Sequence, residues 1–164
     1  MKIQIVNKSN NELPKYETEL AAGMDLRANI VGVNEKFLFN ADVIKENDVI
    51  TKVIIYPGGR ALIPTGLHIA LQDKGLEAMV RPRSGLALKQ GVTILNTPGC
   101  VDSDYTGDIG VIVINFGANA FEINQGDRIA QLVINKIEHI EWEEVEELPE
   151  TDRGEGGFGS TKVK

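Results

Sequence analysis

The sequence predicts an all-β domain with one short helix. Short runs of β-branched and aliphatic residues recur along the chain, and turn residues such as glycine and proline separate them at fairly regular intervals. Helical periodicity is scarce. With 164 residues, 42% of them hydrophobic, the chain is long enough to bury the core of one globular domain.

Before residue 137, seven segments are predicted strands, and one is a predicted helix. A turn at Pro57-Gly58-Gly59 is expected to end the second strand. The helix is expected between Ser84, which would serve as its N-cap, and Gly91, which would follow its last residue. The predicted strands are residues 2–7, 53–56, 67–71, 76–80, 92–95, 111–115 and 129–134.

The end of the sequence differs from the rest. Residues 137–148 are acidic and ambiguous, and we expect a strand because Ile140 and Trp142 alternate as strand residues do. Residues 153–164 contain four glycines and one aromatic residue, so they cannot pack as a core element. We therefore divide the chain into a β domain, residues 1–152, and a flexible glycine-rich tail.

Composition excludes several classes of function. The formal net charge of −7 does not favour binding of nucleic acid by bulk attraction, although a local basic patch could still bind a small polyanion. A single cysteine excludes an internal disulfide and a cysteine-clustered zinc site. No apolar run is long enough for a membrane span or a signal peptide, and we expect a cytoplasmic protein without a membrane partner.

A first candidate site is Arg81-Pro82-Arg83-Ser84-Gly85, at the start of the predicted helix. Guanidinium groups, a hydroxyl and free backbone amides all favour an anion, above all a phosphate. The alternative is an ordinary helix cap with solvated arginines.

A second candidate is the acid-rich segment 99–108, between two apolar runs, where we expect a hairpin or a turn. Asp102 in such a place could activate a water molecule or hold a metal indirectly. The alternative is a polar turn bonded to its own backbone. Acidic neighbours should raise the pKa of the Cys100 thiol and lower its reactivity.

Three further segments are weaker. Asp25 and Arg27 in residues 21–27 would point to the same face of an extended segment, and a buried ion pair between them is the alternative to a functional site. Gln131 in residues 126–132 is a polar residue in an apolar strand and needs a hydrogen-bonding partner. Phe158 in the glycine-rich tail could fold over a ligand.

Together and in this order, the five segments resemble the five motifs of the homotrimeric dUTP diphosphatase (dUTPase) family. The matching runs are residues 22–25, 83–85, 102–105, 126–131 and 153–160. This resemblance implies a jelly-roll-like subunit in a trimer of the β-clip type, with each active site assembled from three chains. The first, second and fourth motifs would come from one subunit and the third from a neighbour. The tail of the remaining subunit, residues 153–164, would close over the site as a lid.

The resemblance also implies Mg²⁺-dependent hydrolysis of dUTP to dUMP and pyrophosphate, which keeps uracil out of DNA and supplies dUMP for thymidylate synthesis. Asp102 would be the catalytic base that activates water. The substrate phosphates would hold most of the Mg²⁺ coordination, with Asp25 and Gln131 acting through water molecules.

Substrate contacts are likewise implied by the resemblance. Phosphates would bind at the helix start and at the tail, and uracil and deoxyribose would bind around the third motif. The implied substrate-binding residues are Arg83, Ser84, Gly85, Asn96, Gly99, Cys100, Val101, Tyr105, Gly110, Gln131, Arg153, Phe158, Gly159 and Ser160.

One segment departs from the compact family pattern. Residues 33–50 lie between the first two motifs and read as an inserted hairpin or long surface loop. Two other functions stay open: a dCTP deaminase of the same fold, and a nucleotide-sensing protein that has lost turnover. Asp102 and the aromatic tail favour the diphosphatase over both.

Overall fold

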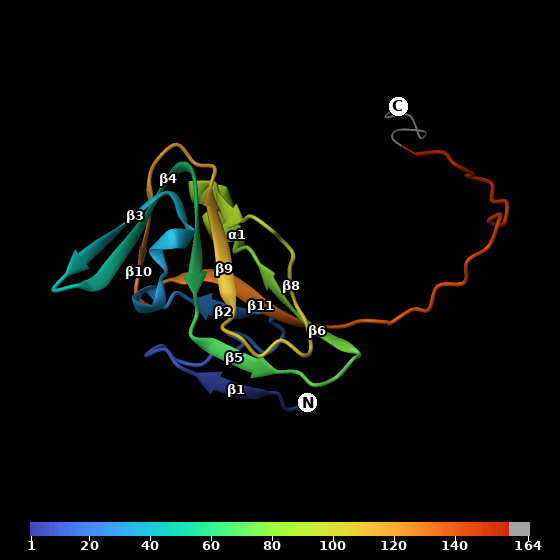
Figure 1. Ribbon diagram of the computed structural model, residues 1–164, viewed down its shortest axis with the longest axis horizontal. Helices are drawn as coiled ribbons and strands as arrows, with labels where there is room; N and C mark the ends of the chain where they lie inside the picture. Colours follow the sequence, from blue (N-terminus) through green and yellow to red (C-terminus); the bar gives the residue numbers. More distant parts are fainter. Residues whose placement is uncertain (158–164) are drawn as a thin grey trace.

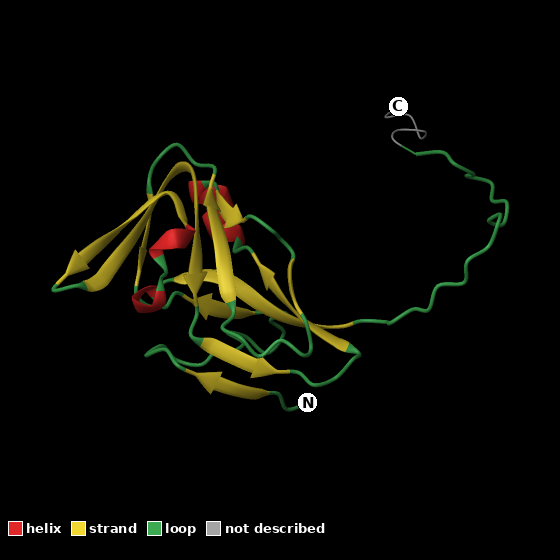
Figure 2. Ribbon diagram, viewed as in Figure 1, coloured by secondary structure: helices red, strands yellow, loops and turns green. Residues whose placement is uncertain are grey.

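The computed structural model describes residues 1–157. Within this range, strands form one body and a long C-terminal segment leaves it (Figure 1). Figure 2 shows that helical structure is limited to short pieces between strands. The prediction of an all-β domain with one short α-helix is confirmed.

Eleven strands and one α-helix are found in the described residues. The α-helix, α1, spans Ser84–Gln90, and the two 3₁₀ turns η1 and η2 span Ile30–Gly32 and Glu35–Phe37. The strands are β1 Gln4–Asn7, β2 Met24–Arg27, β3 Leu38–Glu46, β4 Val49–Pro64, β5 Leu67–Ala70, β6 Leu76–Arg81, β7 Val92–Ile94, β8 Gly99–Val101, β9 Gly110–Asn115, β10 Phe121–Asn124 and β11 Arg128–Lys136.

The strands form three sheets whose paired strands are all antiparallel. One sheet has the order β10–β4–β9–β7 with β3 also paired to β4, a second has the order β2–β11–β6–β8, and β1 pairs with β5. Alternate strand residues face one shared apolar core, as expected for sheets with one buried face. Fully buried members of this core include Leu26, Ile55, Ile63, Val111 and Ile123.

Strand β4 does not end at Pro57-Gly58-Gly59, so the predicted turn is wrong. The strand continues to Pro64, and these residues form an irregularity at which its pairing with β3 jumps from Ile55 to Arg60. Gly58 has a φ of +76°, which favours glycine. β10 pairs with the first half of β4 and β9 with the second half. Pairing on both sides therefore carries the strand through a sequence that locally favours a turn.

Residues 33–50 contain the first arm and the tip of a hairpin, in line with one of the two predicted alternatives. β3 and β4 are joined by Asn47 and Asp48, whose φ angles of +50° and +64° suit the tight turns of two-residue hairpins. The hairpin projects from the body of the molecule (Figure 1). It carries half-exposed apolar side chains, including Phe39, Ile44 and Val49.

Helix α1 begins one residue earlier than predicted. Arg83, in an extended conformation, is the N-cap and makes no side-chain capping bond, so Ser84 is the first helical residue and not the cap. Gly91 ends the helix with a φ of +68°, as predicted.

The strand predicted at 137–148 is absent from the described structure. The ladder between β11 and β6 ends at Lys136, and residues 137–157 carry no strand. Trp142 is 93% exposed. An alternating pattern does not produce a strand without a partner to complete its hydrogen bonds. In residues 1–157 no helix has both the length and the apolar character needed to cross a membrane.

Candidate functional site

A row of polar side chains crosses the sheet β2–β11–β6–β8. Gln131 of β11 pairs directly with Asp25 of β2 on one side and with Arg81 of β6 on the other. Directly paired residues carry their side chains on the same face of a sheet. Since Leu132 and Val80 are buried on the opposite face, this row lies on the face away from the core.

Asp25 joins two arginines in what we call the arginine cluster, Asp25, Arg83 and Arg128. Its side chain is only 10% exposed, with Arg83 Nε 3.0 Å from Oδ1 and Arg128 Nη1 3.1 Å from Oδ2. Arg83 Nη1 also donates to the carbonyl oxygen of Arg128 at 2.8 Å. The alternative interpretation, an ion pair between Asp25 and Arg27, is wrong, because Arg27 donates to the carbonyl oxygen of Gly126 instead.

The arginine cluster adjoins the start of α1. Arg83 and Arg128 line a hollow of about 510 Å³ together with Gln90 and Asp127. A Cβ atom placed on Gly85 would meet nothing within 4 Å, so space is open beside the first helical turn. Two guanidinium groups against one carboxylate leave the cluster positively charged, which suits an anionic ligand such as phosphate.

Asp102 lies on the acidic loop, which we define as residues 102–109. The loop connects β8 of one sheet to β9 of the other, so it is not a hairpin. Ser103 anchors its beginning: the hydroxyl donates to the carbonyl oxygen of Asp73 at 2.7 Å and also lies in hydrogen-bonding range of the Leu76 carbonyl. The Asp102 side chain itself is exposed.

The end of the acidic loop is anchored as well. Asp108 Oδ1 accepts hydrogen bonds from the backbone amides of Thr65 at 3.2 Å and Gly66 at 3.0 Å. The Tyr105 hydroxyl donates to the Asp108 carbonyl at 2.9 Å, and a Cβ atom on Gly107 would collide with the tyrosine ring. The loop is therefore anchored at Ser103, next to the exposed carboxylate of Asp102, and at Asp108, beyond the half-exposed ring of Tyr105.

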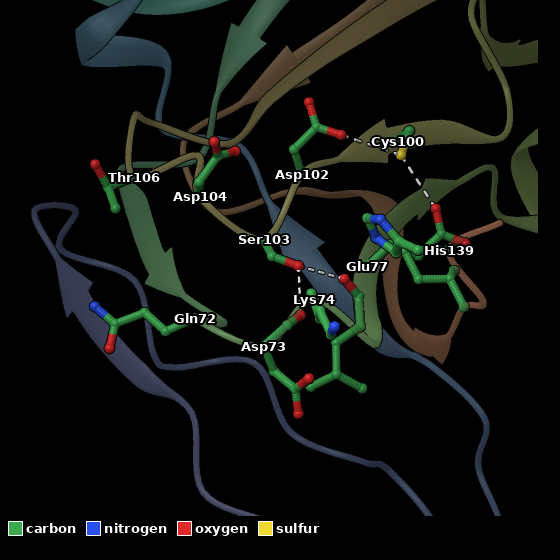
Figure 3. A pocket seen from close by; sticks show the side chains of 12 residues that line it. Gln72, Asp73, Lys74, Glu77, Cys100, Asp102, Ser103, Asp104, Thr106 and His139 are labelled. Atoms are coloured by element: carbon green, nitrogen blue, oxygen red, sulfur yellow. Dashed lines mark hydrogen bonds between the residues drawn. The ribbon is translucent and has the colours of Figure 1, made fainter. Parts of the chain in front are cut away.

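Cys100 links two carboxylates beside this loop. Its thiol donates to Glu77 Oε2 at 3.1 Å, and Asp102 Oδ1 lies 3.9 Å from the sulfur (Figure 3). The hydrogen bond to Glu77, burial and the two negative charges raise the pKa of Cys100 to about 11. The predicted raised pKa of this thiol is confirmed.

Figure 3 shows the hollow into which these groups are gathered. It measures about 770 Å³ and lies between the turn before β6, the acidic loop and the segment that follows β11. Lys74 and His139 share its lining with Glu77, Asp102 and Ser103.

The residues expected to contact the base are only partly gathered. Asn96 is exposed in the turn before β8, and a Cβ atom on Gly99 would lie 3.1 Å from its amide nitrogen. Val101 ends β8, close to Asp102. Gly110, in contrast, opens β9 in the other sheet, beside Pro64.

Within a single chain, Asp102 lies far from the arginine cluster. Val101 pairs with Ala78 near the start of β6, whereas Arg83 follows the end of that strand. Five to six residues of extended chain separate the two places, on the order of 15–20 Å at about 3.3 Å per residue. Within a single subunit the proposed base and the proposed phosphate contacts therefore do not meet.

The tail is described only in part. Arg153 is exposed and its Nε donates to the Gly156 carbonyl at 2.7 Å. This part of the chain has left the strand body (Figure 1). Phe158, Gly159 and Ser160 lie outside the described residues.

A magnesium ion fits the cluster through water molecules rather than through direct ligation. In residues 1–157, no group of three or more histidine, cysteine, aspartate or glutamate side chains could hold a metal. Asp25 Oδ1, however, is buried without a hydrogen bond, since Arg83 Nε approaches it outside hydrogen-bond geometry. With the Gln131 amide beside it, this oxygen suits the water shell that Mg²⁺ retains.

Two residues of these clusters were not identified from sequence. Arg128 lies inside the fourth motif, but no local pattern indicates that it pairs with Asp25, which is 103 positions away. Ser103 stands next to Asp102, and a serine in a polar turn gives no signal that it anchors the loop to residues 73–76.

The sequence and the fold were compared with those of known proteins. The dUTPase family profile matches residues 48–162. A deoxyuridine 5′-triphosphate nucleotidohydrolase of Fusobacterium nucleatum is 48% identical over 161 residues, covering 98% of this chain and 97% of its own length. The enzyme of the same name from Finegoldia magna is 47% identical, covering 98% of this chain and 99% of its own.

Solved structures agree at the level of fold. The dUTPase of Staphylococcus bacteriophage 80alpha, solved with dUpNHpp, superposes with a TM-score of 0.78 at 24% identity and covers 99% of both chains. This likeness supports the jelly-roll-like arrangement of the strands, and the family profile and the two bacterial relatives extend the match to the sequence. The chain belongs to the dUTPase family.

Proposed function

We propose that this protein hydrolyses dUTP to dUMP and pyrophosphate in a Mg²⁺-dependent reaction. The observation that carries the proposal is an exposed Asp102 on an anchored loop, in a chain that also presents a positively charged arginine cluster beside a helix start. Relatives that share nearly half of its sequence over their full lengths are named dUTP nucleotidohydrolases.

Phosphate binding falls to the second and fifth motifs. The guanidinium of Arg83 and the open first turn at Ser84 and Gly85 suit the charge and size of a triphosphate. Arg153, Gly159 and Ser160 close on its outer end, with residues 153–164 acting as a lid that excludes water from the reacting groups.

Asp102 is the catalytic base in this proposal. Its carboxylate orients a water molecule in line with the α-phosphorus and accepts a proton as the oxygen attacks, with pyrophosphate as the leaving group. The two anchors of the acidic loop support this role, since in-line attack requires a fixed position for the base.

Mg²⁺, when bound to the substrate phosphates, neutralises part of the charge that develops on them. Asp25 and Gln131 orient water molecules of its shell, consistent with the buried Asp25 oxygen that lacks a hydrogen bond.

Uracil selection falls to the turn before β8 and to the acidic loop. Asn96 and the backbone near Gly99, Cys100 and Val101 match the uracil edge, with a further backbone contact near Gly110. A cytosine amino group would leave these groups unpaired once the bound base covers them, which is a strong basis for rejection. The ring of Tyr105 lies against the deoxyribose, and Phe158 stacks on the base.

The active form in this proposal is a homotrimer. The separation of Asp102 from Arg83 along β6 supports a site in which the two come from different subunits. One subunit gives Asp25, Arg83 and Gln131, a second gives the acidic loop, and the third gives the tail.

Complementation between inactive variants tests this arrangement. Asp102→Asn and Arg83→Ala should each be inactive, and trimers reassembled from a mixture of the two should regain activity, because some sites then combine an intact Arg83 with an intact Asp102. A mixture of Asp102→Asn with Asp102→Ala is the control and should stay inactive. If the first mixture also stays inactive although mixed trimers form, the shared site is wrong.

A product assay tests the reaction itself. Incubation with Mg²⁺ and dUTP, dCTP, dTTP or UTP should release pyrophosphate from dUTP alone. Ammonia from dCTP would indicate the deaminase alternative. Binding without any product would indicate the nucleotide-sensing alternative.

A further inference from the structure

The arginine cluster holds one more positive charge than its buried carboxylate requires. Asp25 is 10% exposed and lies in contact with Arg83 at 3.0 Å and Arg128 at 3.1 Å. Arg128 is the more exposed of the two, with 43% of its side chain accessible against 27% for Arg83. Arg83 is thus engaged by Asp25 before any substrate is bound.

Phosphate binding by Arg83 has to compete with this contact. If Arg83 turns its Nε toward a phosphate, Asp25 loses one of its two counter-ions. A buried carboxylate left without a partner is strongly unfavourable. Whether Arg83 is available therefore depends on what else neutralises Asp25.

Arg128 meets this requirement through its contact with the other carboxylate oxygen, Oδ2. Its own carbonyl oxygen also accepts a hydrogen bond from Arg83 Nη1 at 2.8 Å, which holds one terminal nitrogen of the Arg83 guanidinium in place independently of Asp25. The side chain of Arg128 therefore contacts the Asp25 carboxylate, and its backbone carbonyl binds Arg83.

Resting on the function proposed above, we propose that Arg128 is a positioning residue for substrate binding. It retains the charge of Asp25 when Arg83 binds the phosphates, so that Arg83 is not held by a buried carboxylate. Without Arg128, Arg83 becomes the sole counter-ion of Asp25 and binds phosphate poorly.

Calorimetric titration with dUTP tests this role. All variants are made in the Asp102→Asn background and titrated in EDTA, so that neither hydrolysis nor Mg²⁺ contributes. Arg128→Ala should weaken dUTP binding about tenfold or more. Arg128→Lys, which keeps the charge, should remain within about threefold of the background. Deoxyuridine, which has no phosphate, should bind all variants equally as a competitor.

The decisive variant is the double change Arg128→Ala with Asp25→Asn. Removing the charge of Asp25 releases Arg83, so the double variant should bind dUTP more tightly than Arg128→Ala alone, by about fivefold or more. If Arg128 instead contacts phosphate directly, Asp25→Asn restores nothing and the inference is overturned. Unchanged binding in Arg128→Ala overturns it too.

Two controls separate this inference from other failures. Arg27→Ala removes a positive charge from the same strand as Asp25 without touching the carboxylate, and should bind dUTP as the background does. Thermal melts of each variant check that it is folded. A background protein that binds no dUTP would contradict the proposed function itself, whereas normal background binding with an unaffected Arg128→Ala contradicts only the role of Arg128.

Discussion

The Ser103 hydroxyl donates a hydrogen bond to the Asp73 carbonyl at 2.7 Å and thereby ties the acidic loop to the turn before β6. The backbone supports the same connection, since the Gln72 amide donates to the Ser103 carbonyl at 3.2 Å. Asp102 is therefore carried by a loop whose first residues are fixed to another part of the sheet.

Ser103→Ala is expected to lower kcat more than it changes KM. The change removes the side-chain anchor next to the base, so the base is held less well in line with its water molecule. Each increase of about 1.4 kcal/mol in the activation free energy slows the reaction about tenfold. The free energy of unfolding should fall by only about 1 kcal/mol, the net contribution of one hydrogen bond to stability. Steady-state kinetics and urea denaturation measure the two effects.

Thr106→Ala is the matched control for this experiment. Thr106 lies on the same loop, and no hydrogen bond of its hydroxyl is found within residues 1–157. Its kinetics should equal those of the parent protein. Equal losses in the two variants would show that the loop tolerates no change at all and would remove the special role of Ser103.

Asp102→Asn is expected to abolish turnover while dUTP binding is largely retained. The amide keeps the size of the side chain but no longer accepts a proton from water, and the arginine cluster is untouched. Pyrophosphate release and calorimetric titration check the two properties separately. Turnover at the parent rate would mean that another group is the base.

Removal of residues 153–164 is expected to reduce activity by more than about tenfold, since a lid excludes water and completes the site. The melting temperature should shift by less than about 2 °C, because the described residues 153–157 bond only to residues 151–156. A large fall in melting temperature with activity preserved would contradict the lid.

Cys100 is expected to react slowly with thiol reagents although it is exposed. With a pKa of about 11 in place of 9.0, the thiolate fraction at pH 8 falls from about one tenth to about one thousandth. Glu77→Gln removes the largest cause of the raised pKa and should speed alkylation severalfold. Mass spectrometry after timed exposure to iodoacetamide at pH 8 follows the single cysteine, and equal rates in the two proteins would contradict this account.

Where local pattern and tertiary pairing agree, the sequence predicts the fold well. The strand at 111–115 and the Gly91 helix end follow from residue type alone, because buried alternation and a left-handed glycine are local properties. Pro57-Gly58-Gly59 misleads because β10 pairs with β4 before these residues and β9 pairs with β4 after them, so the strand continues past the turn signal. Residues 137–148 mislead for the opposite reason: the alternation is present, but the described chain offers no partner strand.

The candidate site divides in a similar way. Asp102 and Arg83 stand out in sequence because their neighbours form recognisable motifs. The contacts that position them depend on residues far away in the chain, as Ser103 with Asp73 and Asp25 with Arg128 show. Such contacts form only when strands pair in a particular register, and no single segment encodes that register.

The β3–β4 hairpin offers a practical opportunity to the experimenter. Next to its Asn47–Asp48 tip, β3 and β4 pair only with each other. Farther along β4, β10 and β9 pair with it as well. A fluorescent dye or an affinity tag spliced in at this tip would extend an existing protrusion (Figure 1) and leave the strands of the core in their present alignment. With the dye in place, fluorescence would report subunit exchange in the mixing experiment.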